Sequence, residues 1–191
     1  MEYTIQRIEP DEAGIEFYLT SYKAFRLTAL QTDPSYFGST YAREVAMSPN
    51  DWRQRILNPA AELFVAVSET REILSSLTLY NAVQVPPALK LRLGLDGDST
   101  TSPAFSHWAV NGVYTTQDAR RRGIAQKVMA EAVKFAIDAA ASQNIGCLMT
   151  IMVKPDNAKA LGMYEKAGFG LATEASHDGY LQLFRWFPGA L

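Results

Sequence analysis

Arg120-Arg121-Arg122-Gly123-Ile124-Ala125, RRRGIA in one-letter code, is the segment where a strand pattern ends and a helical pattern begins. Upstream, residues 105–115 are rich in aromatic and β-branched side chains, which predicts a strand. Downstream, apolar residues recur with a period near 3.6 as far as residue 140, which predicts a helix starting around Gly123.

The junction between this strand and this helix has the properties of an anion site. The first turn of a helix carries free N–H groups at the positive end of the helix dipole. Gly123 lacks the Cβ that would block close approach of a ligand, and the three arginines add mobile positive charge. We therefore expect the backbone to hold a phosphate here, although a basic loop without a ligand is the alternative.

A second strand and helix follow. Residues 147–153, CLMTIMV, form an apolar run typical of a strand buried on both faces. Asp156 is the expected N-cap of the next helix, and Gly168 is its expected C′ residue. On this helix Asn157, Leu161 and Tyr164 share one face, because they lie at i, i+4 and i+7. An amide at one end of a face and a phenol at the other is unusual for a helix that only packs.

The two motifs together resemble those of the GNAT superfamily of acetyl-CoA-dependent N-acetyltransferases. RRRGIA is similar to that family's R/Q-x-x-G-x-G/A pattern, and residues 157–169, NAKALGMYEKAGF, are similar to its N-x-x-A-x-x-x-Y-x-x-x-G-F helix. The resemblance is close over residues 105–169, and residues 26–56 look like the two-helix front end of many members. It departs from the family at residues 115–119, TTQDA, where a proline or a charged turn is usual.

The strand and helix patterns along the chain occur in the order β, α, α, β, β, β, α, β, α, β, β, which predicts a single mixed α/β layer fold. The resemblance implies the same class: one GNAT-like domain over residues 1–191, with a central mixed, mostly antiparallel sheet of six to seven strands flanked by about four helices. Residues 81–106 are too long for a simple hairpin connection, and connections of this length are usually functional or disordered.

The composition is that of one ordinary globular domain, with 191 residues, 48% of them hydrophobic and 20% charged. A net charge of −2 argues against a nucleic-acid partner. Cys147 is the only cysteine, so no intrachain disulfide is possible and a buried, inert thiol is expected. No signal-peptide pattern and no membrane-spanning apolar stretch occurs, so we expect a cytoplasmic protein without a membrane partner, as a monomer or homodimer.

Other chemistries lack their motifs. Neither a P-loop nor a Rossmann glycine pattern is present, and no G-x-S-x-G presents a serine nucleophile. Asp96 and Asp98 hint at a calcium loop, but its twelfth position would be His107 where a glutamate is needed. Because His107 and His177 are the only histidines and neither lies near a second metal-type ligand, no metal cofactor is expected.

The resemblance assigns acetyl-CoA as co-substrate and places its pyrophosphate at the helix mouth, on Arg120, Arg121, Arg122, Gly123, Ile124, Ala125 and Gln126. The pantetheine arm would bond to the backbone of Val113, Tyr114 and Thr115, with Asn157 on its other side. An amine would attack the thioester directly, and a backbone N–H near Val113 or Tyr114 would stabilise the oxyanion. Tyr164 is the family-matched general acid for the departing thiolate, since a phenol with a pKa of about 10 stays protonated at neutral pH. Packing is its alternative role.

The general base stays open between His107 and bulk water. His107 lies on the same alternating face of its strand as Val113 and has an ordinary pKa of about 6.5, but it is well upstream of the expected thioester. Water that reaches the amine through a polar chain past Asn111 is the other route.

The acceptor pocket is expected to include residues 31–40, the 81–106 connection and the turn at His177. Tyr36 and Phe37 would form an aromatic wall, and Asn111 and His177 would contribute polar groups. No acidic run marks a groove for a polyamine or a basic peptide, so a small-molecule amine is favoured over a protein lysine or N-terminus. A non-catalytic acyl-CoA-binding sensor is the alternative from another class.

Overall fold

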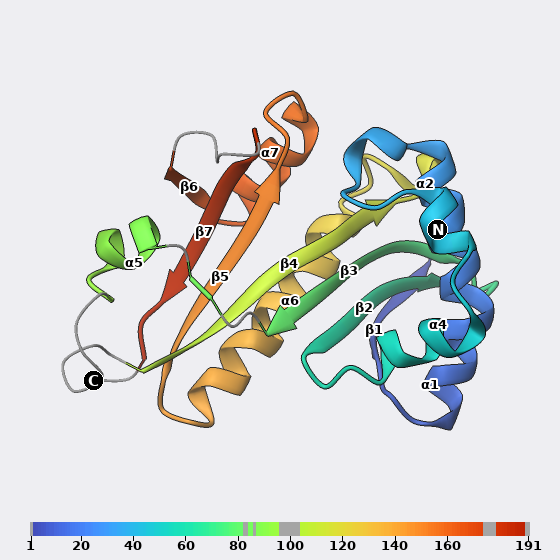
Figure 1. The fold of residues 1–191 in the computed structure, drawn as a ribbon, viewed down its shortest axis with the longest axis horizontal. Helices are drawn as coiled ribbons and strands as arrows, with labels where there is room; N and C mark the ends of the chain where they lie inside the picture. Colours follow the sequence, from blue (N-terminus) through green and yellow to red (C-terminus); the bar gives the residue numbers. More distant parts are fainter. Residues whose placement is uncertain (1, 82–83, 86, 96–103, 174–178, 190–191) are drawn as a thin grey trace. The chain divides into compact units, whose positions relative to one another are not determined.

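The computed structural model describes residues 2–81, 84–85, 87–95, 104–173 and 179–189, shown as a ribbon in Figure 1. The strands are β1 (Tyr3–Ile8), β2 (Ala61–Ser68), β3 (Ile73–Asn81), β4 (Phe105–Thr115), β5 (Gly146–Val153), β6 (Gly170–Thr173) and β7 (Leu181–Phe187). The helices are α1 (Glu12–Phe17), α2 (Lys23–Thr32), α3 (Tyr41–Val45), α4 (Pro49–Ile56), α5 (Pro87–Leu93), α6 (Ile124–Ala141) and α7 (Ala158–Lys166). Three short helical turns complete the described chain: the π-helical η1 (Tyr18–Tyr22) and the 3-10 turns η2 (Pro34–Tyr36) and η3 (Gln117–Ala119).

The seven strands are hydrogen-bonded in the order β1-β2-β3-β4-β5-β7-β6. The β1–β2, β5–β7 and β6–β7 pairs are antiparallel, whereas β4 and β5 are parallel. The predicted fold class, a mixed and mostly antiparallel sheet with flanking helices, is thus confirmed. Strand β5 is buried along its length except at Met152, as its apolar run predicts.

The chain forms two compact units. Unit 1 comprises Met1–Leu79 and Gly112–Glu131, and unit 2 comprises Tyr80–Asn111 and Ala132–Leu191. Strand β4 and helix α6 each contribute residues to both units. The expectation of a single domain over residues 1–191 stays a prediction.

In unit 1 the helices α1 and α4 and the turn η1 pack on strands β1, β2 and β3 (Figure 1). The core contains the fully buried Trp52 of α4 together with Tyr18 and Tyr22 of η1, whose rings stack at 4.8 Å. Both helix starts are fixed by side chains. Asp11 Oδ1 accepts the Gly14 N–H at 2.8 Å, and Ser48 forms a capping box at the start of α4. The sequence predicts both caps, since Asp11 precedes an apolar helical pattern and Ser48 precedes Pro49 and Asp51, and the structure confirms them.

The predicted first long helix is not regular. Its apolar spacing predicts one α-helix from Asp11 to about Leu30, but the described chain changes to π-helical geometry at η1 before α2 begins. A π turn holds more residues than an α turn, so it changes which side chains of α2 face inward. Periodicity alone does not distinguish the two geometries over so short a stretch.

In unit 2 a helix forms inside the long connection between β3 and β4. Leu89 of α5 is fully buried and packs with Val85, Leu148 and Ala172. Arg92 Nη1 donates to the carbonyls of Leu171 and Ala172, both at 2.7 Å, which fixes α5 to the backbone of β6. Part of the predicted loop is therefore a packed helix. No helix among the described residues has both the length and the apolar character that a membrane crossing requires.

Candidate active site

The helix mouth in unit 1 begins at Gly123. Its carbonyl accepts the first bond of α6, from the Lys127 N–H at 3.2 Å, so the following N–H groups belong to the first turn and have no partner within the helix. Gly123 has a φ of +73°, and the nearest atom to an added Cβ would be Gln126 Oε1 at 3.8 Å. The backbone is therefore open to a ligand. Arg121 and Arg122 are exposed beside it, while the side chain of Ile124 is buried in the core.

Arg120 is not the mobile charge expected from the sequence. Its Nη2 donates to Asp33 Oδ2 at 2.5 Å, its Nε donates to the Thr115 carbonyl at 3.0 Å, and its guanidinium lies 5.4 Å from the ring centre of Tyr114. Asp33 follows α2, which is remote in sequence from Arg120, so no local pattern predicts this pair. The Asp33 carboxylate holds the pKa of the Arg120 guanidinium above its usual value, against the opposing effect of partial burial.

The end of β4 is held by side chains from the same unit. Tyr114 is buried, and its hydroxyl donates to Asp33 Oδ2 at 3.0 Å. Burial, followed by the adjacent Asp33 carboxylate, raises the pKa of Tyr114. Ser75 Oγ of β3 donates to the Tyr114 carbonyl at 2.9 Å and lies 2.9 Å from Thr115 Oγ1. The carbonyls of Tyr114 and Thr115 thus already have protein partners, which limits what this backbone can offer a bound cofactor.

A buried ion cluster in unit 1 was missed by the sequence analysis. Glu44 is 1% exposed and receives bonds from Arg26 Nη2 at 2.8 Å, Arg26 Nε at 3.1 Å and Arg55 Nη1 at 2.9 Å. These bonds outweigh burial and lower the pKa of Glu44 from 4.5 to about 2. A signal was available, because Arg26 lies one helical turn after the buried Tyr22 and next to the inward-facing Ala29 and Leu30, where a charge needs a partner.

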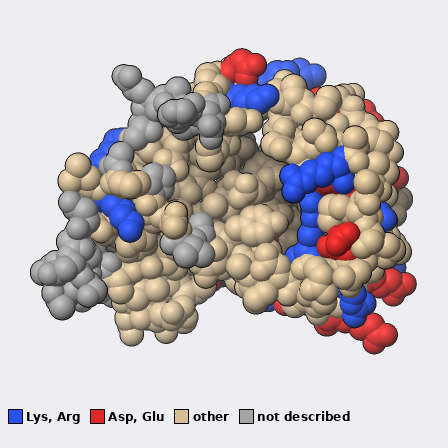
Figure 2. Space-filling model, in the orientation of Figure 1, with Lys and Arg blue, Asp and Glu red and all other residues tan. Residues whose placement is uncertain are grey.

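Figure 2 shows basic and acidic side chains next to one another on the part of the surface where α2 and α4 lie in Figure 1. Ion pairs occur elsewhere in unit 1 as well, since Arg7 bonds to Glu62 at 2.8 Å and Arg120 bonds to Asp33. Mixed charge of this kind fits the small net charge of the whole chain.

In unit 2, helix α7 carries two predicted site residues. Asn157, rather than the expected Asp156, is the N-cap, because its Oδ1 accepts the Ala160 N–H at 3.1 Å. Asp156 lies one position before the cap and is exposed. The family-like asparagine therefore has a structural task that uses its carbonyl oxygen, while its amide nitrogen takes no part in the cap.

The other end of α7 is a Schellman motif. The Gly168 N–H donates to the Glu165 carbonyl at 2.9 Å and the Phe169 N–H donates to the Tyr164 carbonyl at 3.0 Å, with Gly168 at a φ of +83°. The rings of Tyr164 and Phe169 meet edge to face, 6.4 Å between centres. Gly168 as C′ is confirmed. Tyr164 is 6% exposed, and burial raises the pKa of its phenol, which stays protonated at neutral pH.

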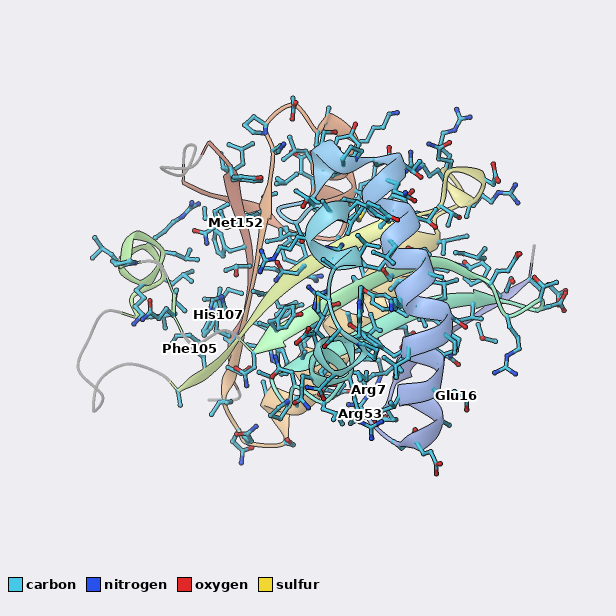
Figure 3. All side chains as sticks on the ribbon, turned by 45° about the vertical axis from the view of Figure 1, so that its right-hand side comes forward. Arg7, Glu16, Arg53, Phe105, His107 and Met152 are labelled. Atoms are coloured by element: carbon cyan, nitrogen blue, oxygen red, sulfur yellow. The ribbon has the colours of Figure 1, made fainter. Side chains whose placement is uncertain are left out.

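His107 lies near the start of β4, as Figure 3 shows, and is 6% exposed. Its Nε2 lies 2.8 Å from Thr150 Oγ1 of β5, so a ring nitrogen is bonded inside the sheet. The parallel register of β4 and β5 ends at Val110 and Ile151, although β4 continues to Thr115 and β5 to Val153. His107 is thus in the paired part of the strands.

The expected acceptor residues differ in placement. Tyr36 in η2 is 53% exposed, whereas Phe37 is half-buried, 4.6 Å from the Arg26 guanidinium and 5.7 Å from the Tyr114 ring. Asn111 is exposed, and its Nδ2 donates to the Ala109 carbonyl at 3.3 Å. His177 lies outside the described residues.

The single cysteine and the possible metal ligands are considered next. Cys147 is buried, and burial raises the pKa of its thiol to about 11, in agreement with the expected inert thiol. Within the described part of the chain, no group of three or more His, Cys, Asp or Glu side chains is placed to hold a metal ion.

Comparison with known proteins shows the family of this chain. The sequence profile of the acetyltransferase (GNAT) family matches residues 26–169, so the chain belongs to this family of acetyl-CoA-dependent acetyltransferases. No curated protein sequence matches the chain.

Solved structures share the fold at low sequence identity. Arabidopsis thaliana NAA60 in complex with acetyl-CoA aligns with a TM-score of 0.64 at 12% identity, covering 97% of this chain and 98% of that one. A GNAT-family acetyltransferase from Streptococcus pneumoniae aligns with a TM-score of 0.64 at 14% identity, covering 97% and 99%. The spermidine N-acetyltransferase from Vibrio cholerae, in complex with CoA and spermine, gives a TM-score of 0.57 at 10% identity, covering 96% and 95%.

Proposed function

We propose that this protein transfers the acetyl group of acetyl-CoA to a primary amine of a small molecule, by direct attack of the amine on the thioester. The observation that carries the proposal is membership of the GNAT family over residues 26–169, which include both sequence motifs. Transfer to a protein lysine or N-terminus is the second candidate, since structural neighbours include an alanine acetyltransferase of ribosomal protein S5 from Vibrio fischeri.

The helix mouth fits the pyrophosphate of the cofactor. An added Cβ at Gly123 would meet only the end of the flexible Gln126 side chain, so a phosphate can approach the first-turn N–H groups of α6. Arg121 and Arg122 are exposed and supply charge, whereas Arg120 would have to leave Asp33 to contact a phosphate. The proposed pyrophosphate residues are therefore Gly123 to Gln126 with Arg121 and Arg122, and Arg120 takes a supporting part.

The proposed chemistry has two steps. The amine lone pair attacks the thioester carbon, and the N–H of Val113 or Tyr114 stabilises the resulting oxyanion. When the intermediate collapses, the carbon–sulfur bond breaks and the thiolate leaves. As this bond breaks, Tyr164, which is protonated at neutral pH, gives its proton to the sulfur, and its phenolate then regains a proton from solvent.

Solvent is the proposed acceptor of the proton that the amine loses. Bonding of His107 to Thr150 and its burial support this route, because a base must reach the amine or a water next to it. Asn111 is exposed on the same strand, so water has access to β4 at that position.

A substitution of Tyr164 tests the proposal. Tyr164→Phe removes one hydroxyl and keeps the ring that contacts Phe169, so the fold and the affinity for acetyl-CoA should stay close to wild type. Release of free thiol with a saturating amine should fall by about 10²–10⁴-fold in kcat. Tyr3→Phe is the matched control, since Tyr3 lies on β1, which supplies no proposed site residue, and it should keep full kcat. An unchanged kcat in Tyr164→Phe would reassign Tyr164 to packing.

A further inference from the structure

Arg26 of α2 is only partly used by its ion pair. Both of its hydrogen bonds among the described residues go to Glu44, through Nε and Nη2, and its side chain is 14% exposed. The guanidinium group has a further nitrogen, Nη1, with two more donors. No hydrogen bond joins Nη1 to another described residue, so this nitrogen can donate to a ligand.

The position of Arg26 Nη1 shows which strand this nitrogen faces. The Cβ that Gly112 lacks would lie 3.9 Å from this atom, so Nη1 faces β4 where the strand has no side chain. Gly112 has a φ of +61°, a conformation that glycine adopts without strain. A side chain at this position would touch Nη1, so the glycine lets the guanidinium lie close to the backbone of β4.

The charge balance of the cluster favours an anion. Glu44 lies between Arg26 and Arg55, so two guanidiniums share one carboxylate and one positive charge is left over. Arg55 is 31% exposed in its side chain and is better solvated than Arg26. A cation that is shielded from water attracts an anionic partner, and the planar guanidinium matches the two oxygens of a carboxylate.

The neighbours of the Arg26 guanidinium include residues close to the proposed reaction. Phe37 covers one face of the Arg26 guanidinium at 4.6 Å and contacts Tyr114 at 5.7 Å. Tyr114 follows Gly112 by two residues on β4 and belongs to the backbone stretch proposed for the thioester. Arg26, Phe37, Gly112 and Tyr114 therefore form one wall, within unit 1, of the place where an acceptor would lie.

We propose that Arg26 Nη1 binds a carboxylate of the acceptor, so that the acceptor is a small amino acid rather than a simple alkyl amine. This inference rests on the proposed N-acetyltransferase function. A lysine in a protein carries no carboxylate next to its amine, so the same contact selects against protein acceptors.

Matched pairs of acceptors test the proposal. Free L-amino acids, the same amino acids as primary amides, and 2-aminoethyl phosphate are compared by release of free thiol from acetyl-CoA. Wild type should favour the free acids. Arg26→Gln should lower kcat/KM for the acids by about 10- to 100-fold, the value of one hydrogen bond to a charged group, and should change that for the amides little. Arg55→Gln is the control, because it disturbs the same carboxylate without facing β4, and it should keep the preference.

Calorimetry measures the affinity of the protein for the free amino acids and so tests the same site without turnover. Circular dichroism checks the fold of each variant, and Arg26→Lys, which keeps a charge but loses the forked donors, serves if Arg26→Gln does not fold; it should lose part of the preference. Equal kcat/KM for acids and amides in wild type would overturn the inference and leave the acetyltransferase intact. A preference for 2-aminoethyl phosphate would show that the site binds a phosphate and would overturn the proposal that it binds a carboxylate. Acid binding that depends on Arg26 but gives no thiol release would support the site and contradict the proposed function.

Discussion

Replacing Glu44 by glutamine removes the carboxylate that two buried or half-buried arginines share in unit 1. Glutamine has nearly the same shape, so packing is kept and the charge alone is lost. Arg26, which is 14% exposed, then keeps its charge without its main partner. We expect the variant to fold but to be less stable at neutral pH.

The size of the loss follows from the pKa of Glu44, which is lowered from 4.5 to about 2 in the folded protein. A lowered folded pKa stabilises the protein above the unfolded pKa, and this contribution is lost as pH falls through the folded value. The difference in pKa corresponds to about 3 kcal/mol at pH 7 and to about 1 kcal/mol at pH 3. Removing one partner of a buried ion pair costs a similar amount, about 3–5 kcal/mol.

Urea unfolding of wild type and Glu44→Gln at pH 7 and at pH 3 measures both quantities. The difference in free energy of unfolding should be about 3 kcal/mol at pH 7 and should shrink by about 2 kcal/mol at pH 3. Glu62→Gln is the control, because Glu62 pairs with Arg7 nearer the surface and should cost less than about 1 kcal/mol. A loss below about 1 kcal/mol in Glu44→Gln, or one that does not shrink at low pH, would refute the assigned role of Glu44.

Three further outcomes are expected. Millimolar acetyl-CoA should raise the melting temperature of wild type, and Gly123→Asp should abolish that shift, because it puts a side chain and a negative charge at the helix mouth; a retained shift would place the pyrophosphate elsewhere. His107→Ala should keep the shape of the kcat/KM profile against pH, and a fall of about 100-fold with an unchanged fold would make His107 the base. Gly168→Ala should destabilise the protein by about 1–2 kcal/mol in urea, since its φ is +83° and Arg185 Cζ would lie 3.0 Å from the new Cβ; an unchanged midpoint would show that the helix end adapts.

Local patterns predicted the elements around the two motifs well. Strand β4 spans Phe105–Thr115 as expected, and α6 begins at Ile124, one residue after the expected glycine. These segments are long or end at a glycine with positive φ, so local residues determine them. The N-cap of α7 was misplaced by one residue because aspartate and asparagine cap equally well, and only the backbone conformation distinguishes Asp156 from Asn157.

The contacts that shape the candidate site were not predictable in this way. Asp33 pairs with Arg120 across 87 positions of sequence, and Glu44 binds two arginines from separate helices. The apolar neighbours of Arg26 indicate that it needs a partner, but nothing in its own segment identifies Glu44 as that partner. Helix α5 was hidden for a related reason, since its stability comes from Leu89 in the core and from Arg92 on β6 rather than from a strong local pattern.

The Schellman motif that ends α7 also limits how this segment can be redesigned. The Tyr164 carbonyl accepts the Phe169 N–H, and the ring of Phe169 packs on the phenol of Tyr164. The end of the helix and the position of the Tyr164 hydroxyl therefore depend on the same two residues. An insertion between these two residues would shift the register of the turn and carry the phenol with it. The interval from Tyr164 to Phe169 therefore has to keep its length in any redesigned chain.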